Sequence, residues 1–552
     1  MQPNLPTDYY LDNVLILFKH VESLYRDIIP KTDLEFLESF SGLTTDAKRL
    51  YIRLLNRSHV LFRLSKLNYA EIGSIPSAMQ ELESLDFLKI NFALERADLI
   101  RLFNQSELLA FHPQKTLLKK IKRSELDVLL LESEADFFSQ LQASDQFIQV
   151  SRKESYQLCQ MLFFGNLSQS MTDFVLRDLG LNRYENYDIN PKNRPYKNEV
   201  EIKQHWLLFQ LGLILEAADS DDIDSLITCF EAVPVDVDSD RILYRHCERI
   251  KYRIARQLER LKHYALAVSY YSQCQLPPSR ERRVRTLSQQ GNIDQALQLC
   301  EHMIEQPLAE EESQFASDFS ERLAKRHGRE ILRHSITPIL PLKKSKSIDL
   351  VLDKQRSVER AVAEYFAEQD SENTCIYIEN ALFNGVLGLL IWEIIFLPVA
   401  GAFYNDFQHR PADFYAHDFL KKRQGVFDKL WSSLTSNADI LQRVTNVWVT
   451  KHGLMNPLVN WPALNLPTIE LALKRIEFSH WIAIFERLLQ DLGNNRSGFP
   501  DLILFPAEQG YELIEVKGPG DTLQKNQKRW MTYFSQKGIP HSVARVSWNL
   551  DS

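Results

Sequence analysis

"SGFPDLILFPAEQGYELIEVKGPGD", residues 497–521, decides the architecture of the C-terminal part of the chain. Its two short apolar runs flank a five-residue turn that contains Gly510, and this pattern predicts a β-hairpin. Downstream, "TLQKNQKRWMTYFSQKG" (522–538) has the apolar spacing of a helix closed by glycine. "HSVARVSW" (541–548) then predicts a last strand. We therefore expect an α/β domain at this end of the chain.

Three charged residues interrupt strands whose composition is otherwise that of a buried core. Asp501 follows Pro500, whereas Glu515 and Lys517 lie two residues apart on the second strand and so share one face. Converging carboxylates repel unless a cation lies between them, and oxygen ligands without histidine or cysteine suit Mg²⁺ or Mn²⁺. A neighbouring lysine holds a water or neutralises charge that develops on phosphorus. The pattern predicts metal-dependent phosphodiester chemistry; surface ion pairs on an edge hairpin are the alternative.

The composition limits the kind of partner and the compartment. The chain has 552 residues, of which 44% are apolar, so it has room for several domains. Its net charge is −8, so any contact with nucleic acid must come from local basic patches. The six cysteines have no C-x-x-C spacing, and the N-terminus lacks signal-peptide features. We expect an intracellular protein, nuclear or cytoplasmic and nucleoid-associated, that is not secreted.

The apolar run "ALFNGVLGLLIWEIIFLPVA" (381–400) has the length of a membrane span. Glu393 and Pro398 interrupt it, and no basic cluster flanks it closely. We therefore expect a buried helix and no membrane contact, with Glu393 buried and hydrogen-bonded.

The remaining chain is predicted to be mostly helical. Residues 1–110 are expected to form a helical DNA-binding region, and 111–160 a hairpin that resembles the SAP type. Residues 161–365 contain two similar segments offset by 29, which resemble a tetratricopeptide array. Within them, 336–350 has the prolines and lysines of a linker. The C-terminal domain is expected at 366–552, with a helical insertion at about 404–495.

Clusters of basic residues are candidate contacts to DNA phosphates, although solvated helix faces are the alternative interpretation. The arginines at 280–285 are the candidates for a 5′-phosphate pocket. The full set of candidates is Arg49, Arg53, Arg57, Lys119, Lys120, Lys122, Arg280, Arg282, Arg283 and Arg285.

The arrangement Pro500-Asp501, then Glu515-x-Lys517, resembles the PD-(D/E)XK nuclease superfamily. "GFPDLILF", "LIEVKGPGDTLQKNQ" and "VARV" resemble its VRR-NUC branch. Upstream, "YIENALFNGVLGLLIWEIIF" (377–396) and "VERAVAEYF" (358–366) are similar to the Fanconi-associated nuclease family. The N-terminal segments "AKRLYIRLLNR" and "KLNYAEI" also match that family. The expected fold is multidomain: mostly α-helical N-terminal and tetratricopeptide-like regions followed by an α/β PD-(D/E)XK (VRR-NUC) nuclease domain.

The resemblance also implies roles for individual residues. Metal ligands would be Glu379, Asp501, Glu515 and the backbone carbonyl of Val516. Lys517 would lie beside the attacking water, and Gln527 would support the site. "VARV" departs from a full V-R-R, but its strand is expected to pack behind the site.

The implied activity is metal-dependent and structure-selective, namely 5′-flap endonuclease and 5′-to-3′ exonuclease in interstrand-crosslink repair. Its substrate would be branched or flapped duplex DNA with a 5′ end, and the protein is expected to be a monomer. Two alternatives stay open: a non-catalytic helical-repeat scaffold that binds branched DNA or proteins, and a Holliday-junction-type resolvase.

Overall fold

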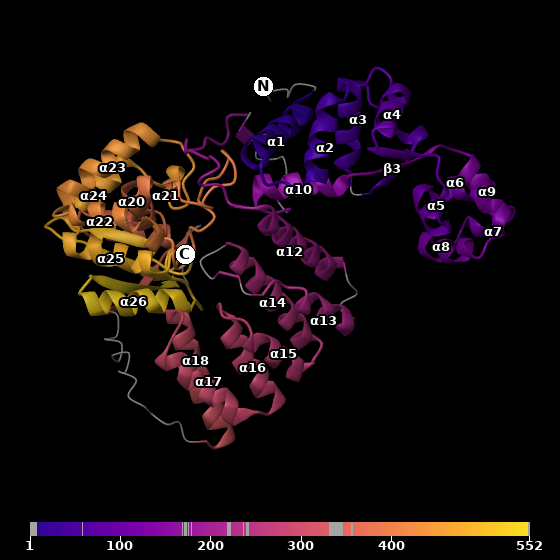
Figure 1. Cartoon of the computed structure of the whole chain (residues 1–552). Helices are drawn as coiled ribbons and strands as arrows, with labels where there is room; N and C mark the ends of the chain where they lie inside the picture. The colour runs from indigo at the N-terminus through magenta and orange to yellow at the C-terminus, as the bar shows by residue number, and fades with distance from the viewer. Residues whose placement is uncertain are drawn as a thin grey trace. The chain divides into compact units, whose positions relative to one another are not determined.

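The computed structural model describes residues 8–549, apart from positions 58, 168, 170–173, 175, 178, 218–221, 236, 239–241, 330–345, 355 and 356. Its contacts divide the chain into two units. The first is Met1–Leu179 with Lys197–Ile202, and the second is Gly180–Tyr196 with Lys203–Ser552. Helices predominate before residue 330, as predicted from the sequence (Figure 1).

The first unit combines helices with a small sheet. Its helices are α1 (Tyr9–Tyr25), α2 (Lys31–Gly42), α3 (Thr45–Leu55), α4 (Ile75–Ser84), α5 (Arg96–Leu102), α6 (Gln105–Phe111), α7 (Lys115–Leu118), α8 (Arg123–Leu131), α9 (Ala135–Ala143) and α10 (Lys153–Phe164). Its strands are β1 (Leu61–Arg63), β2 (Leu88–Ile90) and β3 (Phe147–Val150), antiparallel in the order β1-β3-β2. We predicted only helices up to residue 110, because strands of three residues are too short to show an alternating pattern.

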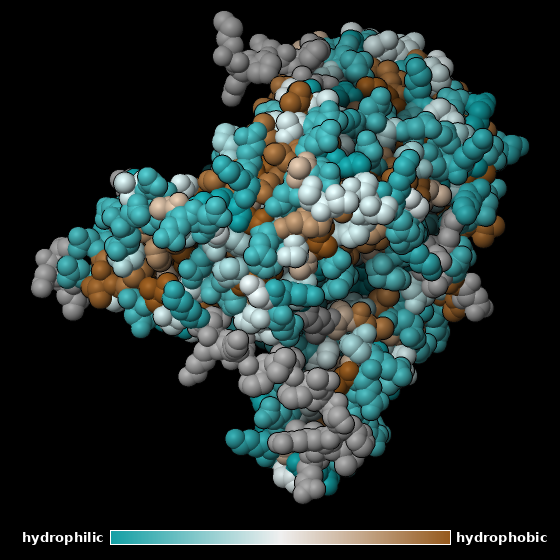
Figure 2. All heavy atoms as spheres, turned by 90° about the vertical axis from the view of Figure 1, so that its left-hand side faces the viewer, coloured by the Kyte–Doolittle hydropathy of each residue, from teal (hydrophilic) through white to brown (hydrophobic). Residues whose placement is uncertain are grey.

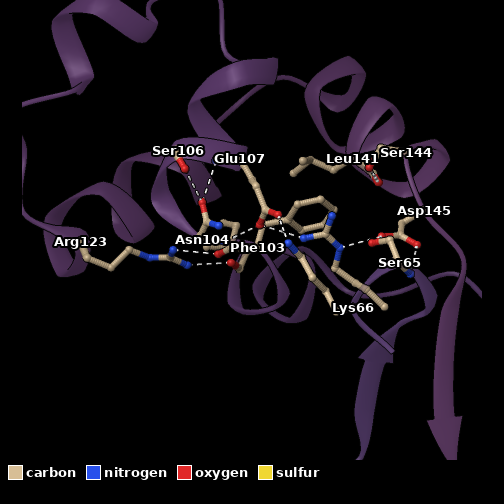
Figure 3. A network of polar contacts seen from close by, with 12 residues as sticks. Ser65, Lys66, Phe103, Asn104, Ser106, Glu107, Arg123, Leu141, Ser144 and Asp145 are labelled. Atoms are coloured by element: carbon tan, nitrogen blue, oxygen red, sulfur yellow. Dashed lines mark hydrogen bonds and ion pairs between the residues drawn. The ribbon is translucent and has the colours of Figure 1, made fainter. Parts of the chain in front are cut away.

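Helices α5 to α9 share a small hydrophobic core, which takes in part of the expected SAP-like hairpin. Figure 3 shows the polar network beside it, in which Glu107 faces Lys66 at 2.7 Å. Arg63 of β1 contacts Glu107 at 2.8 Å and Asp145, just before β3, at 2.9 Å. These ion pairs attach the helical cluster to the sheet.

The first half of the second unit consists of helices, and from α13 on each packs against its sequence neighbours. They are α12 (Glu199–Ala217), α13 (Ile223–Glu231), α14 (Ile242–Arg260), α15 (Tyr264–Ser272), α16 (Ser279–Gln290), α17 (Ile293–Glu305) and α18 (Glu310–His327). Ala267 and Ala296, the equivalent small residues of the predicted repeat, are both fully buried. Such residues let neighbouring helices approach closely, in keeping with stacked pairs.

The second half is built on a five-stranded mixed sheet. Its strands are β4 (Lys346–Leu352), β5 (Thr374–Tyr377), β6 (Leu502–Phe505), β7 (Glu512–Lys517) and β8 (His541–Trp548), in the order β4-β8-β7-β6-β5. The β6–β7 hairpin and the last strand are confirmed. β5–β6 and β6–β7 are antiparallel, whereas β7–β8 and β4–β8 are parallel.

Each face of this sheet has its own core. On one face, Leu502 and Ile514 pack with Val362 of α19 (Val358–Gln369). On the other, Ile503 and Leu513 join the large core, which includes α20 (Leu382–Leu390), α25 (Phe478–Gln490) and α26 (Lys525–Lys537). Because side chains alternate along a strand, the odd-numbered residues of β6 and β7 belong to the second face. Other elements here are α21 (Trp392–Ile395), η2 (Lys421–Arg423), α22 (Gln424–Ser432), α23 (Asn437–Lys451), η3 (Trp461–Ala463) and α24 (Leu466–Arg475).

The linker predicted at 336–350 is only partly within the described residues. Positions 336–345 lie outside them, whereas 346–350 belong to β4, so the linker interpretation is wrong there. β4 is an edge strand in which only Leu350 is buried, and the prolines and lysines just before it favoured a linker interpretation although Ile348, Leu350 and Leu352 alternate. The sheet thus begins before residue 366; the domain boundaries stay predictions.

The apolar run at 381–400 forms two short helices, α20 and α21, that meet at Ile391. In the part of the chain that the structure describes, no helix has the length and apolar character that crossing a membrane requires. Glu393 is exposed on α21, so its predicted buried role is wrong. The face in Figure 2 is mostly hydrophilic, with hydrophobic residues in small separate patches.

Candidate active site

The hairpin brings Asp501 and Glu515 together. Leu502 pairs with Ile514 and Ile503 with Leu513, so one further step of this register places Asp501 opposite Glu515 on the same face. Directly opposite residues of an antiparallel pair have Cβ atoms about 5 Å apart. The backbone N–H of Val516 donates to Oδ2 of Asp501 at 2.9 Å, which holds the carboxylate against β7.

The loop that carries Asp501 is anchored on α26. Gly498 has φ +94°, and a Cβ there would lie 2.9 Å from the carbonyl carbon of Asn526. Only glycine suits both the conformation and the space. Phe499 follows, buried against Trp530 with ring centroids 4.1 Å apart. The sequence "GFPD" therefore fixes the position of the aspartate relative to the helix.

Glu515 is fully buried, and the ammonium of Lys517 lies 2.7 Å from its Oε1. Among the described residues, neither oxygen of Glu515 has a hydrogen bond of good geometry, so the ion pair is its main stabilising contact. Burial, followed by the charge of Asp501, raises the pKa of Glu515 to about 7. Burial also raises the pKa of Asp501 to about 6, against the opposing effects of the Val516 N–H and Lys517.

Glu379 lies beside Asp501 through its backbone. The N–H groups of Ile378 and Glu379 donate to the carbonyl of Asp501 at 2.9 and 3.0 Å. Glu379 has φ +25°, a strained conformation for a residue with a side chain. Its carboxylate accepts hydrogen bonds from the Tyr377 hydroxyl and from Nδ2 of Asn380. Its charge contributes to the raised pKa of both hairpin carboxyls, so Glu379 belongs to the same site.

Sequence reasoning missed Glu359, in the first turn of α19. Its charge helps to raise the pKa of Asp501 and that of Tyr377, so it faces the site from the opposite side of the hairpin strands. The residue lies in the quoted segment 358–366, but an acid after the capping Ser357 has the ordinary appearance of a helix start.

Two accessory residues occupy specific backbone positions. Oε1 of Gln527 accepts a hydrogen bond from the N–H of Gln524 at 2.9 Å, as part of a capping box at the start of α26. The N–H and C=O of a strand residue point to the same side, so the carbonyl of Val516 faces the edge where its N–H meets Asp501. The roles of both residues stay predictions.

The "VARV" strand does not pack behind the site. β8 lies beside β7, with Arg545 in register with Lys517. Residues in register share a face, and Arg545 is exposed, so it flanks Lys517.

The basic residues of the first unit divide into paired and exposed groups. Arg49 contacts Asp8 at 2.6 Å, and Arg53 contacts Glu71 at 2.6 Å. These ion pairs give both arginines a structural role. Arg57, Lys119, Lys120 and Lys122 are exposed.

The same distinction applies to the arginines at 280–285. Their acidic partners are Glu312 for Arg280, Glu259 for Arg282 and Glu281 for Arg285. Arg283 differs because it forms no ion pair within the described residues, and its Nε has no hydrogen-bond partner there either. Burial lowers the pKa of this half-buried guanidinium, which an anion would stabilise.

The donor set at the hairpin has the chemistry of a cation site. Asp501 and Glu515 offer oxygen atoms only, their charges repel, and the oxygens of Glu515 lack good hydrogen bonds. No group of three or more His, Cys, Asp and Glu side chains in the described ranges is arranged to hold a metal ion. The carboxylate of Glu379 instead contacts Tyr377 and Asn380. Asp501 and Glu515 therefore fit a divalent ion, whereas the role of Glu379 as a ligand stays a prediction.

Comparison with known proteins places this site in a family. Residues 436–548 match the family model of the VRR-NUC domain, and 8–89 match that described as "FAN1, HTH domain". The Fanconi-associated nuclease 1 homolog of Pseudomonas aeruginosa is 30% identical over 565 residues, which cover 100% of this chain and 98% of that protein. The Arabidopsis thaliana homolog is 22% identical over 603 residues, covering 99% and 67%.

A solved structure agrees over the whole chain. The crystal structure of paFAN1 bound to 2nt 5′flap DNA with gap has a TM-score of 0.85 and 29% identity, and the match covers 100% of both chains. Together, the mixed sheet, its facing acids and the VRR-NUC match define a structure-selective DNA nuclease, a hydrolase of a class that uses divalent metal. The chain belongs to the Fanconi-associated nuclease 1 family.

Proposed function

We propose that this protein is a 5′-flap endonuclease and 5′-to-3′ exonuclease that uses Mg²⁺ or Mn²⁺ and acts in interstrand-crosslink repair. The observation that carries the proposal is the pair of facing carboxyls, Asp501 and Glu515, with Lys517 at 2.7 Å from Glu515. The likeness to a nuclease bound to a 5′-flap DNA supports the choice of substrate.

The metal would be held by oxygen atoms from three segments. Asp501 and Glu515 supply carboxylates, and the carbonyl of Val516 faces the same edge. Glu379, whose backbone N–H is hydrogen-bonded to the carbonyl of Asp501, supplies the third carboxylate. A divalent ion held there supplies an activated water and stabilises the leaving oxygen.

Two further side chains would stabilise charge and orient the reacting groups. Within the described residues, Lys517 is the cation that contacts Glu515, and its ammonium would stabilise the negative charge that develops on the pentacovalent phosphorus. Because Glu515 is fully buried, this charge acts in a medium of low polarity and is weakly screened. Gln527, held in the capping box of α26, would orient the water or the phosphate.

DNA phosphates would bind to the basic residues that are not engaged in ion pairs. Arg283 has a half-buried guanidinium without an acidic partner among the described residues, so it is the best candidate for the 5′-phosphate pocket. Lys119, Lys120 and Lys122 are exposed in the first unit and suit a duplex arm. We further propose a monomer that acts on nuclear or nucleoid DNA.

Cleavage of an end-labelled 5′-flap duplex in Mg²⁺ and in Mn²⁺ tests the proposal. Wild type is compared with Asp501→Asn and with Glu508→Gln, which removes an exposed carboxylate from the loop of the same hairpin. A titration of the same DNA in Ca²⁺ measures binding separately. We expect cuts near the junction for wild type and Glu508→Gln, no cuts for Asp501→Asn, and equal DNA binding by all three.

Two results would contradict the proposal. Binding without cleavage by wild type in either metal would favour the helical-repeat scaffold. Preferential cutting of four-way junctions by a dimer in solution would favour the resolvase.

A further inference from the structure

A hollow of about 780 Å³ opens beside Glu379. Three segments line it: residues 377–384, 457–463 and 493–497. The first carries Glu379, and the last ends four residues before Asp501. The hollow therefore has one candidate metal ligand, Glu379, in its lining. Its volume lies within the range of about 300–1,000 Å³ typical of small-ligand sites.

Specific contacts build the walls of this hollow. The segment around Leu458 approaches α20 so closely that a Cβ at Gly388 would lie 2.8 Å from Cβ of Leu458. Across the hollow, Nδ2 of Asn384 donates to the carbonyls of Asn380 and Arg496, both at 2.7 Å. Asn384 is 95% buried by these contacts, since only 5% of it is exposed. The asparagine thereby fixes two of the three lining segments to each other.

The lining combines one cation with apolar and aromatic surface. Arg496 is exposed and has no acidic partner within the described residues, and its guanidinium lies 5.0 Å from the ring centre of Tyr415. The ring of Tyr377 is 55% exposed at the mouth. Leu458 and Ala463 contribute apolar surface on the opposite wall.

This combination matches the chemistry of a nucleotide. Aromatic rings stack on bases of any sequence, and arginine pairs with phosphate oxygens through two parallel hydrogen bonds. Tyr377 also donates its hydroxyl to Glu379, so the stacking surface and the candidate metal ligand are neighbours. Because Glu379 lines the hollow and its backbone is hydrogen-bonded to Asp501, a strand whose scissile phosphate lies at these ligands runs beside the hollow.

We propose that the hollow binds a nucleotide of the cut strand that adjoins the scissile phosphate. Its base lies between Tyr377 and the 457–463 wall, and Arg496 binds the neighbouring phosphate. This inference rests on the proposed nuclease function and adds a site that holds the strand in register for the cut. Because stacking accepts every base, the site selects for an unstacked nucleotide and not for a sequence.

The test compares cleavage of a 5′-flap duplex with that of duplexes that carry one abasic residue on either side of the mapped cut. Ala463→Trp fills the hollow, and Asn460→Trp does so from a second lining position if the first variant melts early. Arg496→Gln removes the cation, whereas Lys474→Gln removes an exposed cation of α24 outside the hollow and serves as the control.

We expect an abasic residue at one flanking position to slow wild-type cleavage about tenfold, because stacking on an aromatic ring stabilises a bound base by about 1–3 kcal/mol. The filled variant should be slowed at least as much on normal DNA and should no longer respond to the abasic residue. Arg496→Gln should be about tenfold slower, and Lys474→Gln unchanged. Wild-type rates in the filled variant, or equal rates on all duplexes, would overturn the inference.

A second readout separates this inference from the proposed function. In Ca²⁺, 2-aminopurine at the flanking positions reports stacking by quenched fluorescence, without any need for cleavage. If the wild-type protein quenches the fluorescence and Ala463→Trp does not, the result supports nucleotide binding in the hollow, even if no metal ion supports cleavage. Fluorescence that is the same for both proteins overturns it, whatever the outcome of the cleavage assay.

Discussion

Asp501 lies opposite Glu515 just before β6 begins, and the ammonium of Lys517 contacts Glu515 at 2.7 Å. Like charges that face each other across a hairpin destabilise it. The fold holds them there through the backbone: Val516 donates to the side chain of Asp501, and residues 378 and 379 donate to its carbonyl. The site thus retains a repulsion that a bound cation relieves.

Removing one of the two charges should stabilise the metal-free protein at high pH. The folded pKa of Asp501 is about 6, above its ordinary value of 3.8, so stability falls as pH rises from the lower value to the higher and stays reduced above it. Asp501→Asn should therefore raise the free energy of unfolding near pH 8 by on the order of 1 kcal/mol, and by less near pH 5. Urea unfolding in EDTA measures both. An equal gain at the two pH values, or a gain in the Glu508→Gln control, would refute this explanation.

Cleavage should require both hairpin carboxyls to lose their protons. The pKa values of about 6 for Asp501 and about 7 for Glu515 place this step close to neutrality. At fixed subsaturating Mg²⁺, the single-turnover rate should rise roughly tenfold per pH unit while one proton must leave, and level off above both values. Saturating metal should shift the rise to lower pH, because cation binding competes with protonation. A rate that does not change between about pH 5.5 and about pH 7.5 would contradict this prediction.

Asn380 should be a positioning residue for two catalytic segments. Its Oδ1 accepts from the N–H of Gly498 at 3.1 Å, and its Nδ2 donates to Glu379 at 3.3 Å. Asn380→Ala should slow cleavage about tenfold by loosening both segments. Asn380→Asp keeps the acceptor toward Gly498 but loses the donor toward Glu379. If orientation of Glu379 matters, this variant should need more metal for half-maximal rate, with near-normal melting; melting losses without a change in metal demand would indicate a structural role alone.

Glu311 of α18 should link the helices that precede residue 330 to α26, which packs on the five-stranded sheet. It forms an ion pair with Arg529 of α26, whose side chain is only 9% exposed, and accepts from Asn494 at 2.8 Å. Glu311→Ala leaves a buried guanidinium unpaired and should lower the free energy of unfolding by on the order of 1 kcal/mol, which thermal melting detects as a lower melting temperature. Arg529→Met in the same protein should recover most of the loss. Additive effects of the two substitutions would show that the pair is not coupled.

Local patterns in the sequence were sufficient for the C-terminal hairpin, its helix and the last strand. "DLILF" and "YELIEVK" are short, mostly apolar runs separated by a short turn, so the pairing is local and brings Asp501 to Glu515 with little help from the rest of the chain. The same holds for the burial of Ala267 and Ala296, which helical spacing already implied. β4 escaped notice because the prolines and lysines before it are typical of a linker, and its alternating residues Ile348, Leu350 and Leu352 extend beyond the predicted linker.

The sequence by itself determined the chemistry: two acids and a lysine at fixed spacing on adjacent strands, whose faces follow from the two-residue period of a strand. Only the tertiary structure decided how deeply these groups are buried and which charged residues lie next to them. The depth of burial of Glu515, the proximity of Glu359 and the ion pairs of Arg280 and Arg282 all depend on residues far apart in the chain. The spacing of charges in the sequence cannot distinguish a paired arginine from one such as Arg283, because the acidic partner comes from another helix. An arginine whose charge is neutralised in an ion pair is less available to bind a phosphate.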